Sequence, residues 1–104
     1  MSFKRCEILL PTRYNDGFPV EEEHFAQTRR DLVAEFGAVT WSPERVQGIW
    51  SQGGNIFEDT HIKVVIDVED GPAVRAFFAR LKGTLKSHFR QIDIWMVSYP
   101  IEIH

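Results

Sequence analysis

Two carboxylates and an imidazole lie within four residues of one another, in the segment from Glu58 to His61. His61 opens a run of alternating apolar and polar residues, so Asp59 and His61 are expected to project from the same face of a strand. A carboxylate that orients an imidazole is the usual equipment of a general base. The segment therefore predicts His61 as a proton-transfer residue assisted by Asp59 and Glu58, with a surface histidine beside a loop acid as the simpler alternative.

A second set of residues could hold a ligand or line an interface. Arg13 offers an anion-binding guanidinium and Tyr14 a phenol, both in the loop after the first expected strand. Whether this loop reaches His61 depends on the strand pairing of residues 38–60, which the pattern leaves open. Aromatic residues on the expected strands complete the set, namely Trp41, Trp50, Trp95 and Tyr99.

Familiar catalytic and metal-binding motifs are absent from the sequence. Gly53-Gly54 lacks the Gly-Lys-Ser/Thr sequel of a phosphate-binding loop and predicts a turn. The four histidines lie on separate expected elements, without the spacing of zinc ligands. We therefore expect no metal and no cofactor, and leave open whether the chain is an enzyme.

Length and composition bound the class of protein. The chain has 104 residues, of which 43% are hydrophobic, and this suits one domain over residues 1–104. Its 15 acidic and 12 basic side chains give a formal charge of −3, so we expect no nucleic-acid partner. The single cysteine, Cys6, excludes an internal disulfide. No apolar run is long enough for a membrane span or a signal peptide, so we expect a cytoplasmic protein with no membrane partner.

Helical spacing of apolar residues predicts two helices. The first is expected from Val20 to Phe36, with Gly37 as the residue that closes it. The second is expected to begin at Asp70-Gly71-Pro72, with Asp70 as the capping residue, and to run to about Arg90.

Alternation of apolar and polar residues predicts four strands and a possible short fifth one. They are expected at Lys4 to Leu10, Ala38 to Ser42 (stopped by Pro43), Arg45 to Ser51, Thr60 to Val68, and Gln91 to Tyr99. The resulting order, β-α-β-β(-β)-α-β, is that of a ferredoxin-like α+β two-layer sandwich, with both helices on one face of an antiparallel sheet.

The same alternation assigns the two faces of the sheet. The face under the helices is expected to carry Cys6, Ile8, Leu10, Ile62, Val64, Ile66, Ile92, Ile94 and Met96. The open face is expected to carry Leu9, Val65, Trp95, Val97 and Tyr99, joined by one or both of Trp41 and Trp50. Apolar side chains on an open face indicate a partner subunit or a ligand. We expect a homodimer through this face, with a protein partner or a small apolar ligand as alternatives.

Three segments carry a resemblance to other proteins. They are Glu35-Phe36-Gly37-Ala38-Val39-Thr40, Val46-Gln47-Gly48-Ile49-Trp50 and Ile94-Trp95-Met96-Val97-Ser98-Tyr99. Together they resemble a family of small bacterial proteins of about this length with no assigned activity, although Ala38 stands where the family pattern has a second glycine. The resemblance implies the ferredoxin-like fold and carries over no functional residue.

In topology alone the chain is also similar to dimeric α/β-barrel proteins, which include small monooxygenases and isomerases. Topology does not determine function. The leading expectation is a self-associating binding or accessory module. The alternative is a barrel-type enzyme or small-molecule binder for an apolar or aromatic ligand.

Overall fold

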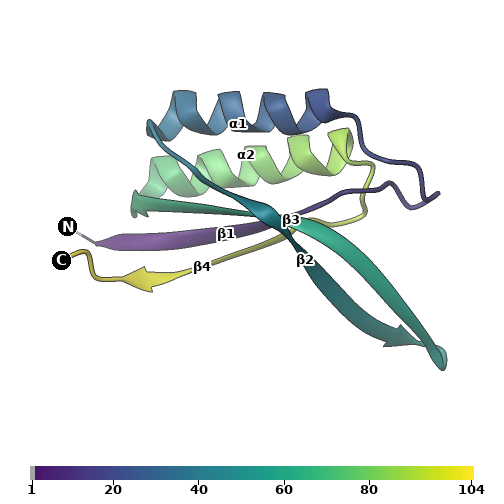
Figure 1. Cartoon of the computed structure of the whole chain (residues 1–104). Coiled ribbons are helices and arrows are strands. Elements are labelled where there is room, and N and C mark those ends of the chain that lie inside the picture. The colour runs from purple at the N-terminus through teal and green to yellow at the C-terminus, as the bar shows by residue number, and fades with distance from the viewer. Residues whose placement is uncertain (1) are drawn as a thin grey trace.

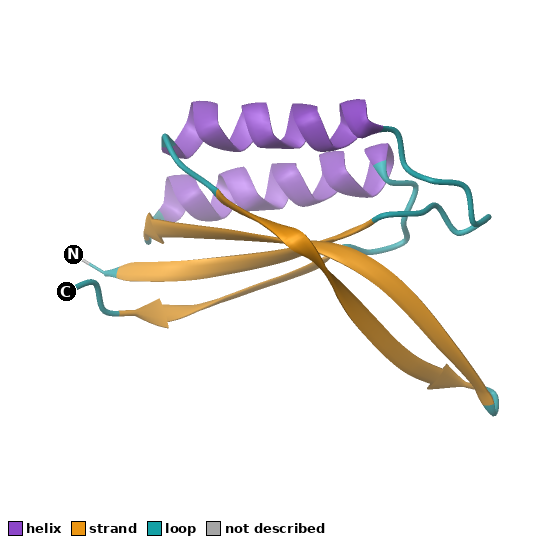
Figure 2. Ribbon diagram, viewed as in Figure 1, coloured by secondary structure: helices purple, strands orange, loops and turns teal. Residues whose placement is uncertain are grey.

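The computed structural model describes residues 2–104, apart from the side chains of residues 43 and 44. The elements follow one another as β1 (Phe3–Pro11), α1 (Glu22–Phe36), β2 (Thr40–Gln52), β3 (Asn55–Glu69), α2 (Pro72–His88) and β4 (Trp95–Ile101). Both helices lie on one face of the sheet (Figure 1). Within residues 2–104 no helix covers the other face (Figure 2). The arrangement confirms the expected two-layer α+β fold.

The four strands form one antiparallel sheet in the order β2-β3-β1-β4. The connection through α1 places β2 two positions away from β1, and β3 fills the position between them. The connection through α2 places β4 on the far side of β1. This interleaving is the ferredoxin-like topology.

The two short strands expected between residues 38 and 51 are one strand. β2 runs through position 43, and its register against β3 shifts between Trp41 and Arg45. Trp41 lies opposite Val64 and Arg45 opposite Ile62, so β2 has extra residues here and forms a bulge. A proline is tolerated at this point because β2 is an edge strand, and bulges and edges are where sheets accept proline.

Beyond this irregularity β2 and β3 continue as a long hairpin that projects past the other two strands (Figure 1). We call residues 45–60 the arm. Gly53 and Gly54 close its tip with φ values of 58° and 80°, as the two central residues of a tight hairpin turn require. Every arm residue except Gly48 is exposed, so the arm contributes little to the core.

The core lies between the sheet and the helices. Of the side chains expected on the covered face, Cys6, Ile8, Leu10, Val64, Ile66 and Ile94 are buried, while Ile62 and Met96 pack at the margin. Phe25 and Leu32 come from α1, and Phe78, Leu81 and Leu85 from α2. Phe89, just beyond α2, is completely buried and packs edge-on against Phe25. Phe36 and Phe77 pack against each other at the rim of this cluster.

The beginning of the last strand differs from the prediction. β4 begins at Trp95 and not at Gln91, and Ile92 is 90% exposed. The cause is a turn after α2, where Arg90 has a φ of 52°. Residues 91–94 therefore connect helix and strand, and Ile92 does not belong to the core.

Both helices are slightly shorter than predicted. α1 begins at Glu22 and is closed by Gly37, whose φ of 79° is the left-handed value expected of it. α2 begins at Pro72, and its N-cap is Gly71 and not the expected Asp70. Asp70 Oδ1 forms ion pairs with Nζ of Lys4 at 3.2 Å and with Nη1 of Arg75 at 3.4 Å. The pair with Lys4 connects the start of α2 to β1.

Candidate functional site

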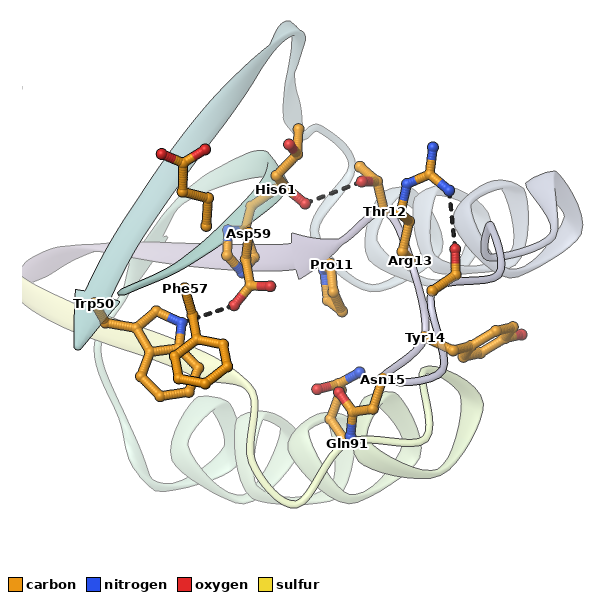
Figure 3. Close-up of a pocket in the computed structure, with 13 residues that line it drawn as sticks. Pro11, Thr12, Arg13, Tyr14, Asn15, Trp50, Phe57, Asp59, His61 and Gln91 are labelled. Atoms are coloured by element: carbon orange, nitrogen blue, oxygen red, sulfur yellow. Dashed lines mark hydrogen bonds between the residues drawn. The ribbon is translucent and has the colours of Figure 1, made fainter. Parts of the chain in front are cut away.

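A pocket of about 460 Å³ opens where the arm leaves the sheet (Figure 3). Its volume falls within the usual range for small-molecule sites. The lining residues come from the end of β1, the β1–α1 loop, the arm with the adjoining residue of β3, and the α2–β4 connection. They are Pro11, Thr12, Arg13, Tyr14, Asn15, Gly17, Trp50, Phe57, Glu58, Asp59, Thr60, His61 and Gln91.

The β1–α1 loop is fixed against β3 at this point. Both the backbone N–H and the hydroxyl of Thr12 donate to the carbonyl of Thr60, at 3.1 and 3.0 Å. Pro11 lies opposite His61 in the β1–β3 register. The strand pairing therefore brings the loop to His61, which answers the question that the sequence left open.

His61 is half-buried on the open-face side of β3. Its ring lies close to Gly48 of β2, and a Cβ built there would stand 3.4 Å from Cε1 of the imidazole. Nδ1 of His61 is buried and has no hydrogen-bond partner among the described residues. Such an atom costs about 1–3 kcal/mol in a folded protein, so it is an uncommon feature.

The two neighbouring carboxylates have partners other than His61. Asp59 Oδ2 accepts the indole N–H of Trp50 at 3.0 Å, and Glu58 Oε2 accepts the side-chain amide of Gln47 at 3.1 Å. Within residues 2–104 no hydrogen bond or ion pair joins His61 to either carboxylate. The expected carboxylate-oriented imidazole is therefore not formed, because the cross-strand partners on β2 occupy the carboxylates.

Arg13 and Tyr14 both line the pocket, but their functional groups are engaged on the loop side. Arg13 Nη1 donates to the carbonyl of Gly17 at 2.9 Å. The Tyr14 ring points away from the pocket (Figure 3). The guanidinium of Arg90 lies over this ring, 4.5 Å from its centroid. The hydroxyl of Tyr14 donates to Glu21, and this bond raises the pKa of the phenol and lowers the pKa of the carboxyl.

The expected aromatic residues separate into three places. Trp50 belongs to the pocket, where its ring stacks on Phe57 with centroids 4.4 Å apart. Trp41 lies on the helix side, edge-on to Phe25, and so does not join the open face. Trp95 and Tyr99 lie on the open face of β4, outside the pocket.

Sequence reasoning misses the other lining residues, among them Asn15, Phe57 and Gln91. It places Gln91 in a strand and gives no role to Asn15 or Phe57. In Figure 3, Trp50, Phe57 and Asp59 lie on one side of Pro11 and the amides of Asn15 and Gln91 on the other. The alternation of the arm could have placed Phe57 beside Asp59, but no local pattern connects Asn15 with Gln91.

The open sheet face carries the expected apolar residues together with charges that are already paired. Leu9 lies between Lys63 and Trp95, Glu7 between Val65 and Val97, and Arg5 between Asp67 and Tyr99. Arg5 donates twice to Asp67, at 2.7 and 3.0 Å, and Lys63 contacts Glu7 at 2.9 Å. Trp95 is 64% exposed and Tyr99 41%.

Two further properties hold over the described residues. No group of three or more His, Cys, Asp and Glu side chains there is arranged to hold a metal ion. Neither helix combines the length and the apolar composition that crossing a membrane requires.

Comparison with protein-family models and with curated proteins finds no match, so the family suggested by the three segments is not confirmed. Solved structures do match in fold. The divalent cation tolerance protein CutA1 from Thermus thermophilus has a TM-score of 0.65 and 19% identity, covering 98% of this chain and 86% of its own.

CutA1 from Oryza sativa has a TM-score of 0.67 and 11% identity, covering 100% of this chain and 84% of its own. A phage SAM lyase in complex with S-methyl-5′-thioadenosine has a TM-score of 0.67 and 12% identity, covering 98% of this chain and 90% of its own. At these identities the likeness supports the ferredoxin-like fold alone. The names of these proteins describe different activities, in line with the separation of fold from function.

Proposed function

We propose that the chain is a small binding module that associates with itself through its open sheet face and its arm. The observation that carries this proposal is the apolar surface that one copy leaves uncovered. Its arm part consists of Val46, Ile49, Trp50, Ile56 and Phe57, which are between 37% and 74% exposed. Its open-face part consists of Trp95 and Tyr99. Exposed apolar surface of this kind is typical of interfaces.

A second copy is the partner that the charges of this face favour. The ionic groups on the open face of β1 and β3 are neutralised within one chain, by the Arg5–Asp67 and Lys63–Glu7 pairs. Two such faces can therefore meet without bringing unpaired like charges together, as a two-fold interface requires. Trp50 and Phe57 of the arm alternate in register with Asp59 and His61 and so continue the same face. The simplest assembly is a homodimer.

Sedimentation velocity over a range of concentrations tests the proposal. We expect a dimer at micromolar concentration, with an interface that buries at least about 1,000 Å². Trp95→Glu should move the protein toward monomer while leaving its helix content unchanged. Val33→Glu is the matched control, since Val33 is 46% exposed but lies on α1 in the opposite layer. A wild-type monomer at high micromolar concentration, or equal effects of the two substitutions, contradicts self-association.

Proton transfer at His61 is the second candidate function. It is favoured by one observation, the half-buried ring beside a pocket with its Nδ1 unpartnered. A general base also needs a group that orients the imidazole, and Asp59 and Glu58 are bonded to Trp50 and Gln47 instead. We therefore place binding before catalysis. A nuclear magnetic resonance titration that shows Asp59→Asn changing the tautomer of His61 would reverse this order.

A further inference from the structure

The arm side of the pocket carries an accessible aromatic surface. Trp50 and Phe57 are cross-strand partners, and their rings stack at 19° to one another. They remain 45% and 41% exposed, so the stack is not covered by the rest of the chain. Aromatic faces carry partial negative charge and bind flat rings and cations.

Negative charge lies directly beside this stack. Asp59 uses Oδ2 to accept the indole N–H of Trp50, and within the described residues Oδ1 has no hydrogen-bond partner. Glu58 adds a second carboxylate to the lining. The one guanidinium of the lining, that of Arg13, is bonded to the Gly17 carbonyl and extends away from Asp59 (Figure 3). The arm side of the pocket is therefore acidic.

The opposite side supplies hydrogen-bond groups that the chain does not use. Gln91 donates through Nε2 to the carbonyl of Phe89, and its Oε1 has no partner among residues 2–104. The Asn15 carboxamide, which Figure 3 shows next to Gln91, likewise has no side-chain hydrogen bond within that part of the chain. Amide oxygens accept the N–H groups of a ligand, and an ammonium group has three to donate.

We propose that this pocket binds a small aromatic cation, a flat ring that bears an ammonium group or a protonated nitrogen. The ring lies against the exposed stack of Trp50 and Phe57, and its charge is held by Asp59. This inference rests on the proposed function, which it deepens by naming the class of ligand that the binding module takes.

Three probes with the same indole ring and different charge test the ligand class. They are the cation tryptamine, the neutral indole-3-acetamide and the anion indole-3-acetate. The indole N–H signal of Trp50 in a proton–nitrogen correlation spectrum reports binding at the site, because this group is bonded to Asp59. Trp41 and Trp95 lie outside the pocket and serve as internal references.

Tryptamine should shift the Trp50 signal with a Kd about tenfold or more below that of indole-3-acetate, the combined effect of an ion pair and a cation–ring contact. Indole-3-acetamide should fall between them. Equal affinity for the three probes overturns the proposal. So does the absence of a Trp50 shift, or a response confined to Trp41 or Trp95.

Two substitutions separate charge from stacking. Asp59→Asn keeps an oxygen that accepts from Trp50 and should abolish the preference for tryptamine over indole-3-acetate. Glu69→Gln, which changes an exposed carboxylate at the other end of β3, should leave the preference unchanged. Phe57→Leu should weaken the binding of all three probes. Phe18→Leu, which changes an exposed ring outside the lining, should leave their binding unchanged. If the preference survives Asp59→Asn, the proposal is wrong.

The same titrations in the Trp95→Glu variant distinguish this proposal from self-association. The whole lining comes from one chain, so tryptamine should bind the monomeric variant at least as well as the wild type, in which a second copy competes for the stack. Self-association can therefore fail in sedimentation while tryptamine still binds at Trp50. Conversely, if the protein is a dimer and tryptamine does not shift the Trp50 signal, self-association is supported and binding of an aromatic cation is contradicted.

Discussion

Gly48 of β2 and His61 of β3 are packed against each other where the arm joins the sheet. A Cβ on Gly48 would stand 3.4 Å from Cε1 and 3.6 Å from Nδ1 of the imidazole. The lack of a side chain at position 48 thus lets the ring lie against the β2 backbone, where its Nδ1 loses contact with water and gains no hydrogen bond. The position of the ring beside the pocket depends on this glycine.

Gly48→Val should therefore displace the His61 ring while leaving the fold intact. Gly48 has no positive φ, and β-branched residues favour strands, so we expect the free energy of unfolding to change by less than about 1 kcal/mol. The proton signals of His61 should move, and tryptamine should bind more weakly. Gly48→Ala is the matched control, since its Cβ reaches only van der Waals contact. Unchanged His61 signals in the valine variant would contradict the role of Gly48.

Phe89 and Ile92 provide a direct test of where the core ends. Phe89 is completely buried against Phe25, so Phe89→Ala should cost about 3–5 kcal/mol in unfolding free energy. Ile92→Ala should change it by less than about 0.5 kcal/mol, because this side chain is 90% exposed. Chemical denaturation measures both. A large loss for Ile92→Ala would mean that β4 begins earlier than Trp95.

Gly83 offers a stabilising substitution. It lies inside α2, is exposed, and no atom lies within 4 Å of the place that a Cβ would take. Gly83→Ala should therefore raise the unfolding free energy by about 1 kcal/mol, the difference in helix propensity. For a domain of this size the melting temperature should rise by about 4–8 °C. A lower melting temperature would contradict this prediction.

Most of the fold follows from periodicity in the sequence. Ile62, Val64 and Ile66 recur at every second position of the strand, and this pattern correctly places them toward the helices. The same alternation fails at Ile92, because a connection that turns at Arg90 can carry alternating residues by chance. Trp41 and Trp50 face opposite sides of the sheet because they are an odd number of positions apart in one strand, and the two extra residues of the bulge before Arg45 leave this alternation unchanged.

Only part of the pocket could be predicted from the sequence. His61, Asp59 and Glu58 are close in the chain and do share one lining. The partners of the carboxylates could not be predicted, because Trp50 reaches Asp59 only through the strand register of the arm. Asn15 and Gln91 meet at the pocket through two connections that are 76 positions apart in the sequence. Such contacts follow from the three-dimensional fold and not from local spacing.

The Arg5–Asp67 pair on the open face predicts how stability depends on pH. Two hydrogen bonds from Arg5 hold the pKa of the Asp67 carboxyl below its ordinary value of 3.8. A carboxyl with a lowered pKa in the folded state binds fewer protons there than in the unfolded chain. Its stabilising contribution is therefore complete above about pH 4 and is lost as the pH falls through the lower, folded-state pKa.

Asp67→Asn should consequently reduce the loss of stability in acid, measured as the unfolding free energy between neutral pH and pH 3. The change should be small, because both side chains of the pair are more than a third exposed and solvent screens them. Glu69→Gln, on the same strand and outside any ion pair of the described residues, is the control. If the asparagine variant keeps the wild-type acid profile, the ion pair does not form in solution. If the variant also dissociates from its second copy at neutral pH, the neutralised charge of the open face is part of the interface.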